Sequence, residues 1–207
     1  MDIPALYSVF RGGEVMTAPT AIEGSRISFA SEPARPEYSA GRSEERMPIV
    51  VADIKGLGRK KLDDRLLTGM KFPGNDIWFM THIEDVEDLF DCFMGNITKV
   101  LMPYHTVRND LVTEEAYDVS DSCIPVVFVS GRRAICRENA AEDLEETLGK
   151  LEKIGFLEIS IFDTDCTINR EDWSSLYKKF RGIIPYVTDR NQIPEDIRPE
   201  YIIYGSR

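Results

Sequence analysis

The sequence predicts an α/β fold, a small closed (β/α)8 barrel of the TIM type that takes up residues 1–207 as a single domain. Short, continuously apolar segments recur about every 25 residues with helical patterns between them, which is typical of parallel strands covered by helices. Several of these segments end in an acid and run directly into a helix, as barrel strands do on the face that carries their sites. An open doubly wound sheet uses the same units. We favour the barrel because no G-x-G-x-x-G follows any strand.

Length, charge and cysteine content limit the class of protein. The chain has 207 residues, 43% of them hydrophobic, which suffices for one domain with a sizeable core. Its 36 acidic and 25 basic residues give a net charge of −11, which disfavours nucleic acid and membrane surfaces as partners. Four cysteines without a CxxC motif argue for reduced thiols rather than structural zinc. No apolar run approaches the roughly 20 residues of a membrane span and no signal peptide is evident, so we expect a soluble cytoplasmic protein.

Eight apolar segments are the expected strands. The first is followed by a turn at Arg11-Gly12-Gly13. Residues 18–47 hold several Pro, Gly and Ser without a helical period, so we expect a long irregular loop there, with a short extended piece at 26–29. The expected strands are residues 3–9, 48–53, 76–80, 98–102, 124–130, 157–162, 183–187 and 201–204.

Helical patterns separate the strands from the second onward. After a loop at residues 55–58, apolar residues recur at helical spacing. Thr81, with Glu84 three residues on, is the expected N-cap of the next helix, and Asn169, with Asp172, has the same role later. The other helical segments are the run up to Met70, residues 110–119 and residues 140–154. No clear helix follows the first strand and only a short one fits before the last, so this barrel lacks a regular first and last helix.

Three acids follow strands on the expected working face: Asp53, Asp163 and Asp165, the last two beside Thr167. Carboxylates that converge at the carboxyl ends of barrel strands can form an acid/base pair or bind a divalent cation. They are therefore the candidate catalytic residues. The structural alternative is that they cap the next helix or pair with nearby arginines.

The two histidines and several arginines also follow strands. His82 and His105 come just after adjacent strands, which would place them on one face, where imidazoles could bind metal or exchange protons near neutral pH. A capping or surface role is the alternative. Arg11 and Arg132 follow the first and fifth strands, and guanidinium groups there indicate a small anionic ligand with a phosphate or carboxylate. Ion pairs with Asp53 and Asp163 would explain them equally well.

The order and spacing of these segments resemble the (β/α)8 barrels of histidine biosynthesis, namely the phosphoribosylformimino-aminoimidazole carboxamide ribotide isomerase, its cyclase relative and related archaeal proteins. Residues 3–12 are similar to the family's first strand and turn, and residues 50–53 to its second strand. Residues 81–89 with 98–102 resemble its third loop, helix and fourth strand, and residues 155–167 its sixth strand, whose loop carries a Thr-Asp and Asp-Gly-Thr signature. The resemblance implies a barrel with isomerase activity and two phosphate sites.

The chain departs from that family at the reacting positions. The family's two catalytic aspartates correspond to Ser8 and to Ser130 with Gly131, and a hydroxyl cannot replace a carboxylate as proton acceptor. Thr81 occupies the place of one glycine-rich phosphate turn, and only Gly205 is retained from the other. The family's own reaction is therefore not expected. The candidate ligand-binding residues are Arg11, Ser8, Thr81, His82, His105, Ser130, Arg132 and Gly205.

Three functions stay open. The first is a diverged ribotide-isomerase-like enzyme without a cofactor, which binds a small anionic metabolite and performs isomerase-like or lyase-like proton transfer. The second is a catalytically degenerate barrel that serves as a ligand-binding, regulatory or interaction subunit. The third is a metal-dependent enzyme with oxygen and imidazole ligands. Because the first and last helices are missing, we expect a second copy of the chain or a partner subunit to cover that side of the barrel.

Overall fold

The protein's structure is a computed structural model. It describes residues 5–10, 20–23, 26–29, 49–69, 76–95, 97–163, 165–187 and 190–204.

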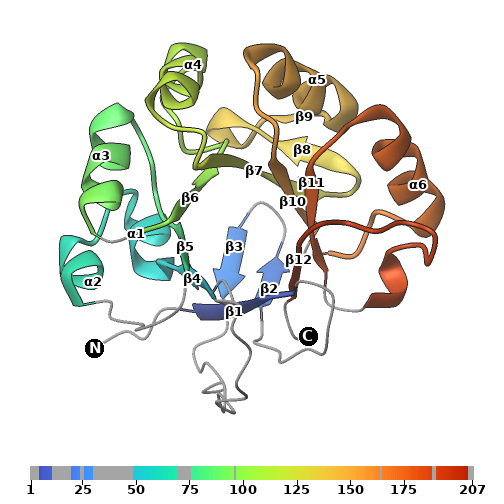
Figure 1. Ribbon diagram of the computed structural model, residues 1–207, viewed down its shortest axis with the longest axis horizontal. Helices are drawn as coiled ribbons and strands as arrows, with labels where there is room; N and C mark the ends of the chain where they lie inside the picture. Colours follow the sequence, from blue (N-terminus) through green and yellow to red (C-terminus); the bar gives the residue numbers. More distant parts are fainter. Residues whose placement is uncertain are drawn as a thin grey trace.

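Eight strands of the described chain pair side by side in a barrel-like ring, which Figure 1 shows end-on. Each of the eight overlaps a predicted segment, with ends that differ by at most two residues, so the predicted strand positions are confirmed. Going round the ring, the order is β1, β4, β5, β6, β7, β10, β11, β12 and back to β1. The strands are β1 (Ala5–Phe10), β4 (Ile49–Ala52), β5 (Ile77–Met80), β6 (Lys99–Pro103), β7 (Cys123–Ser130), β10 (Ile159–Asp163), β11 (Ile183–Val187) and β12 (Ile202–Tyr204).

Strand β1 runs antiparallel to both of its neighbours, so the prediction of eight parallel strands is wrong for this strand. Ala5 lies opposite Ala52, the last residue of β4, and Phe10 lies opposite Ile202, the first residue of β12. The other seven strands of the ring run parallel. A parallel pair needs a crossover connection, usually a helix. The antiparallel β1 ends on the side where β4 begins, so this pair requires no crossover connection.

A short 3-10 helix, η2 (Arg190–Gln192), precedes β12, and six α-helices of the described chain lie outside the ring (Figure 1). The six are α1 (Ile54–Arg59), α2 (Asp64–Gly69), α3 (Val86–Met94), α4 (Asp110–Val119), α5 (Leu144–Ile154) and α6 (Arg170–Lys179). The prediction for residues 110–119 is confirmed. The loop predicted at 55–58 is wrong, because these residues lie within α1.

The cap predicted for α6 is confirmed, and the one predicted for α3 is wrong. Asn169 accepts a hydrogen bond from the amide of Asp172, 2.8 Å away. Helix α3 begins after Asp85 instead of Thr81, and the Asp88 carboxylate accepts the amide of Glu84 at 2.8 Å. Thr81 and Asp85 are each followed by an acid three residues on, so the sequence pattern alone does not separate them.

Two hairpins add to the ring. Strand β7 turns back at Gly131-Arg132, both with positive φ, into β8 (Arg133–Ile135), the short helix η1 (Arg137–Asn139) and β9 (Ala141–Asp143). Helix α5 therefore begins at Leu144, four residues later than predicted. Strands β2 (Thr20–Glu23) and β3 (Arg26–Phe29) form a separate two-stranded sheet, which confirms the extended piece predicted at 26–29. This hairpin projects within the outline of the ring in Figure 1.

Alternate residues of the strands fill two apolar layers. The inner layer includes Trp78, Phe128, Phe162 and Tyr186. The Phe162 and Tyr186 rings stack with their centroids 4.5 Å apart, so side chains fill the ring instead of leaving a channel. The outer layer packs the opposite strand faces against the helices, with Trp173 of α6 fully buried there. Burial on both faces explains why these strands are apolar without alternation.

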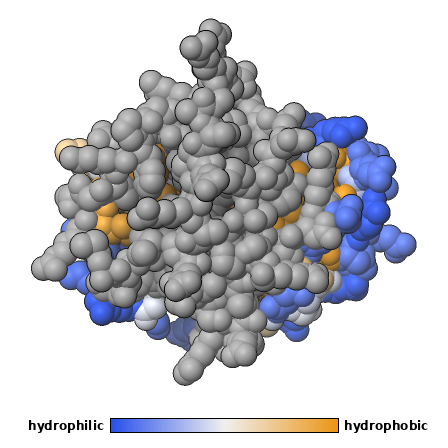
Figure 2. Space-filling view, turned by 90° about the horizontal axis from the view of Figure 1, so that it is seen from below, coloured by the Kyte–Doolittle hydropathy of each residue, from blue (hydrophilic) through white to orange (hydrophobic). Residues whose placement is uncertain are grey.

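The described surface is mainly hydrophilic on the α6 side. Figure 2 views the molecule from the side on which β1 lies, and hydrophilic residues dominate its right flank, with apolar residues visible between them. Leu157, predicted as part of a buried strand, lies before β10 and is 82% exposed. No helix in the described part of the chain has the length and apolar character needed to cross a membrane.

Candidate functional site

The carboxyl ends of the parallel strands bring most of the predicted site residues to one rim of the ring. Asp53 follows β4, Thr81 and His82 follow β5, and His105 lies shortly after β6. Ser130 and Arg132 lie at the end of β7, and Asp163 and Asp165 at the end of β10. These residues form three groups on the rim: around Asp53, around Asp163, and around the two histidines.

Asp53 closes its own loop. Its Oδ1 accepts the amide of Gly56 at 2.7 Å, and its Oδ2 accepts the Thr81 hydroxyl at 2.9 Å and the amide of Asp63 at 3.2 Å. The residue is 1% exposed and is the N-cap of α1. The structural alternative for this acid, a helix cap, is therefore what the structure shows, and Thr81 takes part in it.

Asp163 is held in the same way at the end of β10. Its Oδ1 accepts both the amide and the hydroxyl of Thr167, at 2.9 and 3.0 Å, and its Oδ2 accepts the amide of Ile168 at 2.7 Å. The residue is 0% exposed, and burial raises its pKa above the ordinary value. A raised carboxylate pKa is one mark of a general acid. Here the carboxylate faces its own loop.

The β7–β8 turn is tied to the β10–α6 loop by the remaining predicted polar residues. The Ser130 hydroxyl donates to Oδ2 of the exposed Asp165 at 2.7 Å. The Arg132 amide donates to the Thr167 hydroxyl and its Nε to the Thr167 carbonyl, each at 3.1 Å, while its guanidinium pairs with Asp172 at 3.1 Å. Arg132 thus makes an intramolecular ion pair, with Asp172 rather than with Asp53 or Asp163.

The two histidines keep unused hydrogen-bonding groups. His82 is 6% exposed, and neither its Nδ1 nor that of His105 has a hydrogen-bond partner among the described residues. The His105 ring packs edge-on against Phe128 of the inner layer, with centroids 5.2 Å apart, so it lies over the ring's interior. Burial lowers the pKa of His82, and it lowers that of His105 to about 4, so both imidazoles are neutral at pH 7. The positive charge of Lys60 lowers both pKa values further.

Three predicted residues lie elsewhere or outside the description. Arg11 and Gly205 are outside the described residues. Ser8 lies in β1 opposite Ile49 and Tyr204, and because β1 is reversed its carboxyl end points away from the rim, which corrects the placement predicted for it. Within the described ranges, no three Asp, Glu, His or Cys side chains gather in the manner of a metal site.

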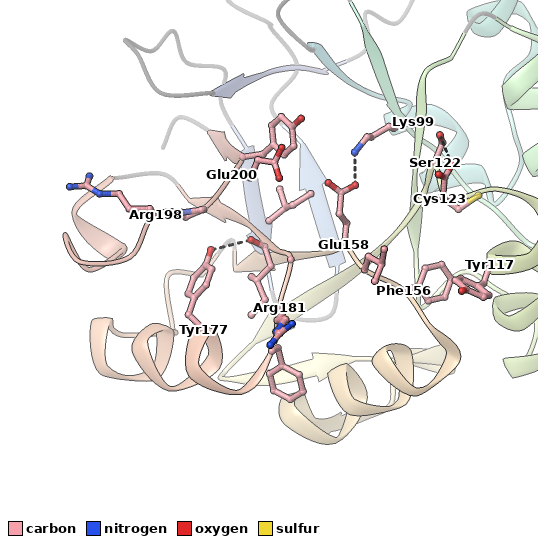
Figure 3. Close-up of a pocket in the computed structure, with 18 residues that line it drawn as sticks. Lys99, Tyr117, Ser122, Cys123, Phe156, Glu158, Tyr177, Arg181, Arg198 and Glu200 are labelled. Carbon is pink, nitrogen blue, oxygen red and sulfur yellow. Dashed lines mark hydrogen bonds and ion pairs between the residues drawn. The ribbon is translucent and has the colours of Figure 1, made fainter.

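A cavity at the opposite pole was not predicted. It has a volume of about 740 Å³ and is lined by the first residues of β6, β7 and β11 and by the residues just before β10 and β12 (Figure 3). Lys99 and Glu158 point toward each other there and form an ion pair. The Lys99 ammonium also lies 4.8 Å from the centroid of the Trp78 ring and 5.4 Å from that of Tyr201. The charge of this lysine is thus balanced within the chain.

The inward direction of Lys99 and Glu158 could have been predicted from the alternation of side chains along their strands. Lys99 is two residues before Leu101, an inward residue of β6, and Glu158 is two residues before the inward-facing position 160 of β10. Both therefore point toward the ring's axis. The position of Lys60 could not be predicted in this way. It follows helix α1, whose two glycines made the segment look like a loop.

These features define an α/β barrel-like protein with its polar loops gathered at the carboxyl ends of its parallel strands. No protein-family model matches the chain, and a comparison with curated proteins finds no match.

Proposed function

We propose that this protein is a (β/α)8-type barrel that binds a small anionic metabolite without performing the proton transfer of the histidine-pathway isomerases. The proposal combines the anionic ligand expected from the sequence with the degenerate barrel considered as an alternative. Its site is the rim above β5 and β6, where Lys60, His82 and His105 lie.

The main support for the proposal is that both aspartates are buried and fully engaged in hydrogen bonds within the protein. Asp53 accepts hydrogen bonds from Gly56, Asp63 and the Thr81 hydroxyl. Asp163 accepts three from Thr167 and Ile168, and both aspartates are at most 1% exposed. A general acid or base must come within hydrogen-bond reach of the substrate proton. Neither carboxylate does so without dismantling the loop that it holds, which favours binding over catalysis.

The histidine pair supplies the anion-binding chemistry. Each neutral imidazole has one N–H donor and one acceptor nitrogen. A buried polar atom without a partner costs about 1–3 kcal/mol, and a ligand that pairs with it recovers that energy. The Lys60 charge acts on both imidazoles and attracts a phosphate or carboxylate to the same place. An anion bound there would in turn favour the protonated imidazoles.

A thermal-shift screen with sugar phosphates and small carboxylates tests the proposal. We expect at least one compound to raise the Tm of the parent protein in a saturable way, and Lys60→Met and His82→Gln to abolish that rise. Lys61→Met, at the exposed neighbouring lysine, is the matched control and should retain it. The chain has two histidines, so their imidazole NMR signals can be assigned with one variant and should both shift when the compound is added.

Two results would overturn the proposal. One is a stabilising compound whose effect survives Lys60→Met and His82→Gln, because it must then bind elsewhere. The other is turnover of a compound that is lost in Asp163→Asn while the variant remains folded, because Asp163 would then take part in catalysis.

A further inference from the structure

The outer face of α3 and α4 carries an apolar groove. The two helices lie side by side outside β6 and β7 (Figure 1), and the groove along them has a volume of about 840 Å³. We call it the α3–α4 groove. Its apolar lining residues are Val86, Phe90, Leu111, Val112 and Val119.

Two large apolar side chains of this groove are exposed and are not part of the protein's core. Phe90 is 54% exposed and Leu111 is 58% exposed. Isolated apolar residues on a surface are ordinary, but these two line one concavity, one from each helix. Burying both would remove a phenyl and an isobutyl group from water, which favours an apolar occupant.

The charge around the groove is negative. Its lining includes Glu87, Glu115 and Asp118, and within the described ranges none of these three makes an ion pair. The groove's one cation, Arg108, pairs with Asp85 at 2.6 Å and so adds no free positive charge. An apolar floor with an unbalanced acidic rim favours an occupant that is apolar on one side and basic along its edges.

We propose that the α3–α4 groove docks a basic amphipathic helix of a partner protein. Such a helix would place its apolar side chains, spaced three and four residues apart, against Phe90 and Leu111. Its lysines or arginines would pair with Glu87 on one edge and with Glu115 and Asp118 on the other. The groove's lining residues do not include Lys60, His82 or His105, so the two proposals are tested with different variants.

The same charges disfavour other occupants. A second copy of this chain carries a net charge of −11, so a symmetric contact would bring like charges together. Nucleic acid and anionic lipid would meet the acidic rim with the same repulsion. A basic partner gains from both the apolar and the electrostatic features.

The experiment uses a fluorescent synthetic peptide of leucine and lysine, designed as an amphipathic helix, and a matched peptide in which glutamate replaces each lysine. Fluorescence anisotropy with the full chain at physiological salt should show saturable one-to-one binding of the lysine peptide and none of the glutamate peptide. Phe90→Ser with Leu111→Ser should weaken binding at least tenfold. Glu115→Lys with Asp118→Lys should weaken it by a similar factor. All four positions are exposed, so the variants should fold.

Leu157→Ser is the matched control, since Leu157 is 82% exposed and does not line the α3–α4 groove, and this variant should bind like the parent. The proposal is overturned if the lysine peptide does not bind, or if Phe90→Ser with Leu111→Ser binds as tightly as the parent, which would mean attraction by charge alone. It is also overturned if sedimentation shows a dimer that the same double variant dissociates, because a second copy would then be the occupant.

Discussion

Asp53 and Asp163 perform the same local task on different strands. Each ends or directly follows a strand of the ring, and each binds amide groups at the start of the next segment with both carboxylate oxygens. An ionised acceptor makes stronger hydrogen bonds than a neutral one, so one buried acid can fix a tight connection between strand and helix. At this scale, the acids on the rim stabilise the loops that surround a site.

Gly56 is required by the Asp53 arrangement. A Cβ at residue 56 would lie 2.0 Å from Asp53 Oδ2 and 2.7 Å from the Lys61 carbonyl oxygen, whereas a Cβ at Gly58 meets nothing within 4 Å. We therefore expect Gly56→Ala to lower the free energy of unfolding by about 2 kcal/mol or more, since it forces Asp53 from its cap. Gly58→Ala in the same helix should raise it by about 0.5–1 kcal/mol. Urea denaturation of both variants measures this, and equal effects would contradict the role assigned to Asp53.

The strand ends in the sequence predict which side chains reach the rim. Whether those side chains point inward or outward follows only from the alternation along each strand. Strand ends placed Asp53, His82, His105 and Asp163 correctly at one rim. Val50 and Ala52 face inward, so Asp53, one residue on, belongs to the outward set. The same alternation places Asp163 on the outward side after the inward Phe162. Side chains on the outward side face the helices, so the alternation favours helix caps over catalytic acids at both positions.

At the scale of elements, Lys99 and Glu158 join strands that are not neighbours. Lys99 begins β6 and Glu158 precedes β10, and β7 lies between those strands in the ring. Trp78 of β5 and Tyr201, just before β12, pack on the Lys99 ammonium and contact each other at 4.9 Å between centroids. These four side chains therefore link strands across the amino-terminal end of the ring.

A double-mutant cycle measures this link. The side chains of Lys99 and Glu158 are 23% and 26% exposed, so their interaction is only partly screened by water. We expect Lys99→Met and Glu158→Gln to show a coupling energy of about 1 kcal/mol. The more exposed Lys179–Glu145 pair, which joins α6 to α5, is the comparison and should give less than about 0.5 kcal/mol. Equal coupling in the two cycles would contradict a special role for the polar group at this pole.

The positions of the ring's strands could be predicted from the sequence, but the direction of β1, helix α1 and the short strands β8 and β9 could not. Continuous apolar runs placed the strands of the ring because burial on both faces imposes that pattern. The reversed direction of β1 was not predicted, because a run of apolar residues does not encode the direction of its strand. Helix α1 was missed because Gly56 and Gly58 lower helix propensity, while Asp53 requires one of them. Strands β8 and β9 have three residues each, too few to show alternation.

At the scale of the whole molecule, buried ionisable groups set how stability depends on pH. Two kinds act in opposite directions. Burial raises the pKa of Asp163, so its contribution to stability is full below its unfolded pKa of 3.8 and is lost as the pH rises through its folded pKa. Burial lowers the pKa of His82 and His105, so their contribution is full above an unfolded pKa of 6.5 and is lost as the pH falls.

The histidines should therefore govern the loss of stability in mild acid. Between pH 6.5 and about 4, His105 takes up a proton in the unfolded chain but stays neutral in the folded one, so the unfolded state binds more protons and is favoured. This difference corresponds to about 3 kcal/mol across the window. Urea denaturation at a series of pH values should show that loss in the parent protein and a clearly smaller one in His105→Gln. An unchanged slope in the variant would mean that His105 is accessible to water and protonates freely in the folded state. In that case its unpaired Nδ1 would be solvated, and a ligand at the rim would recover no energy by pairing with it.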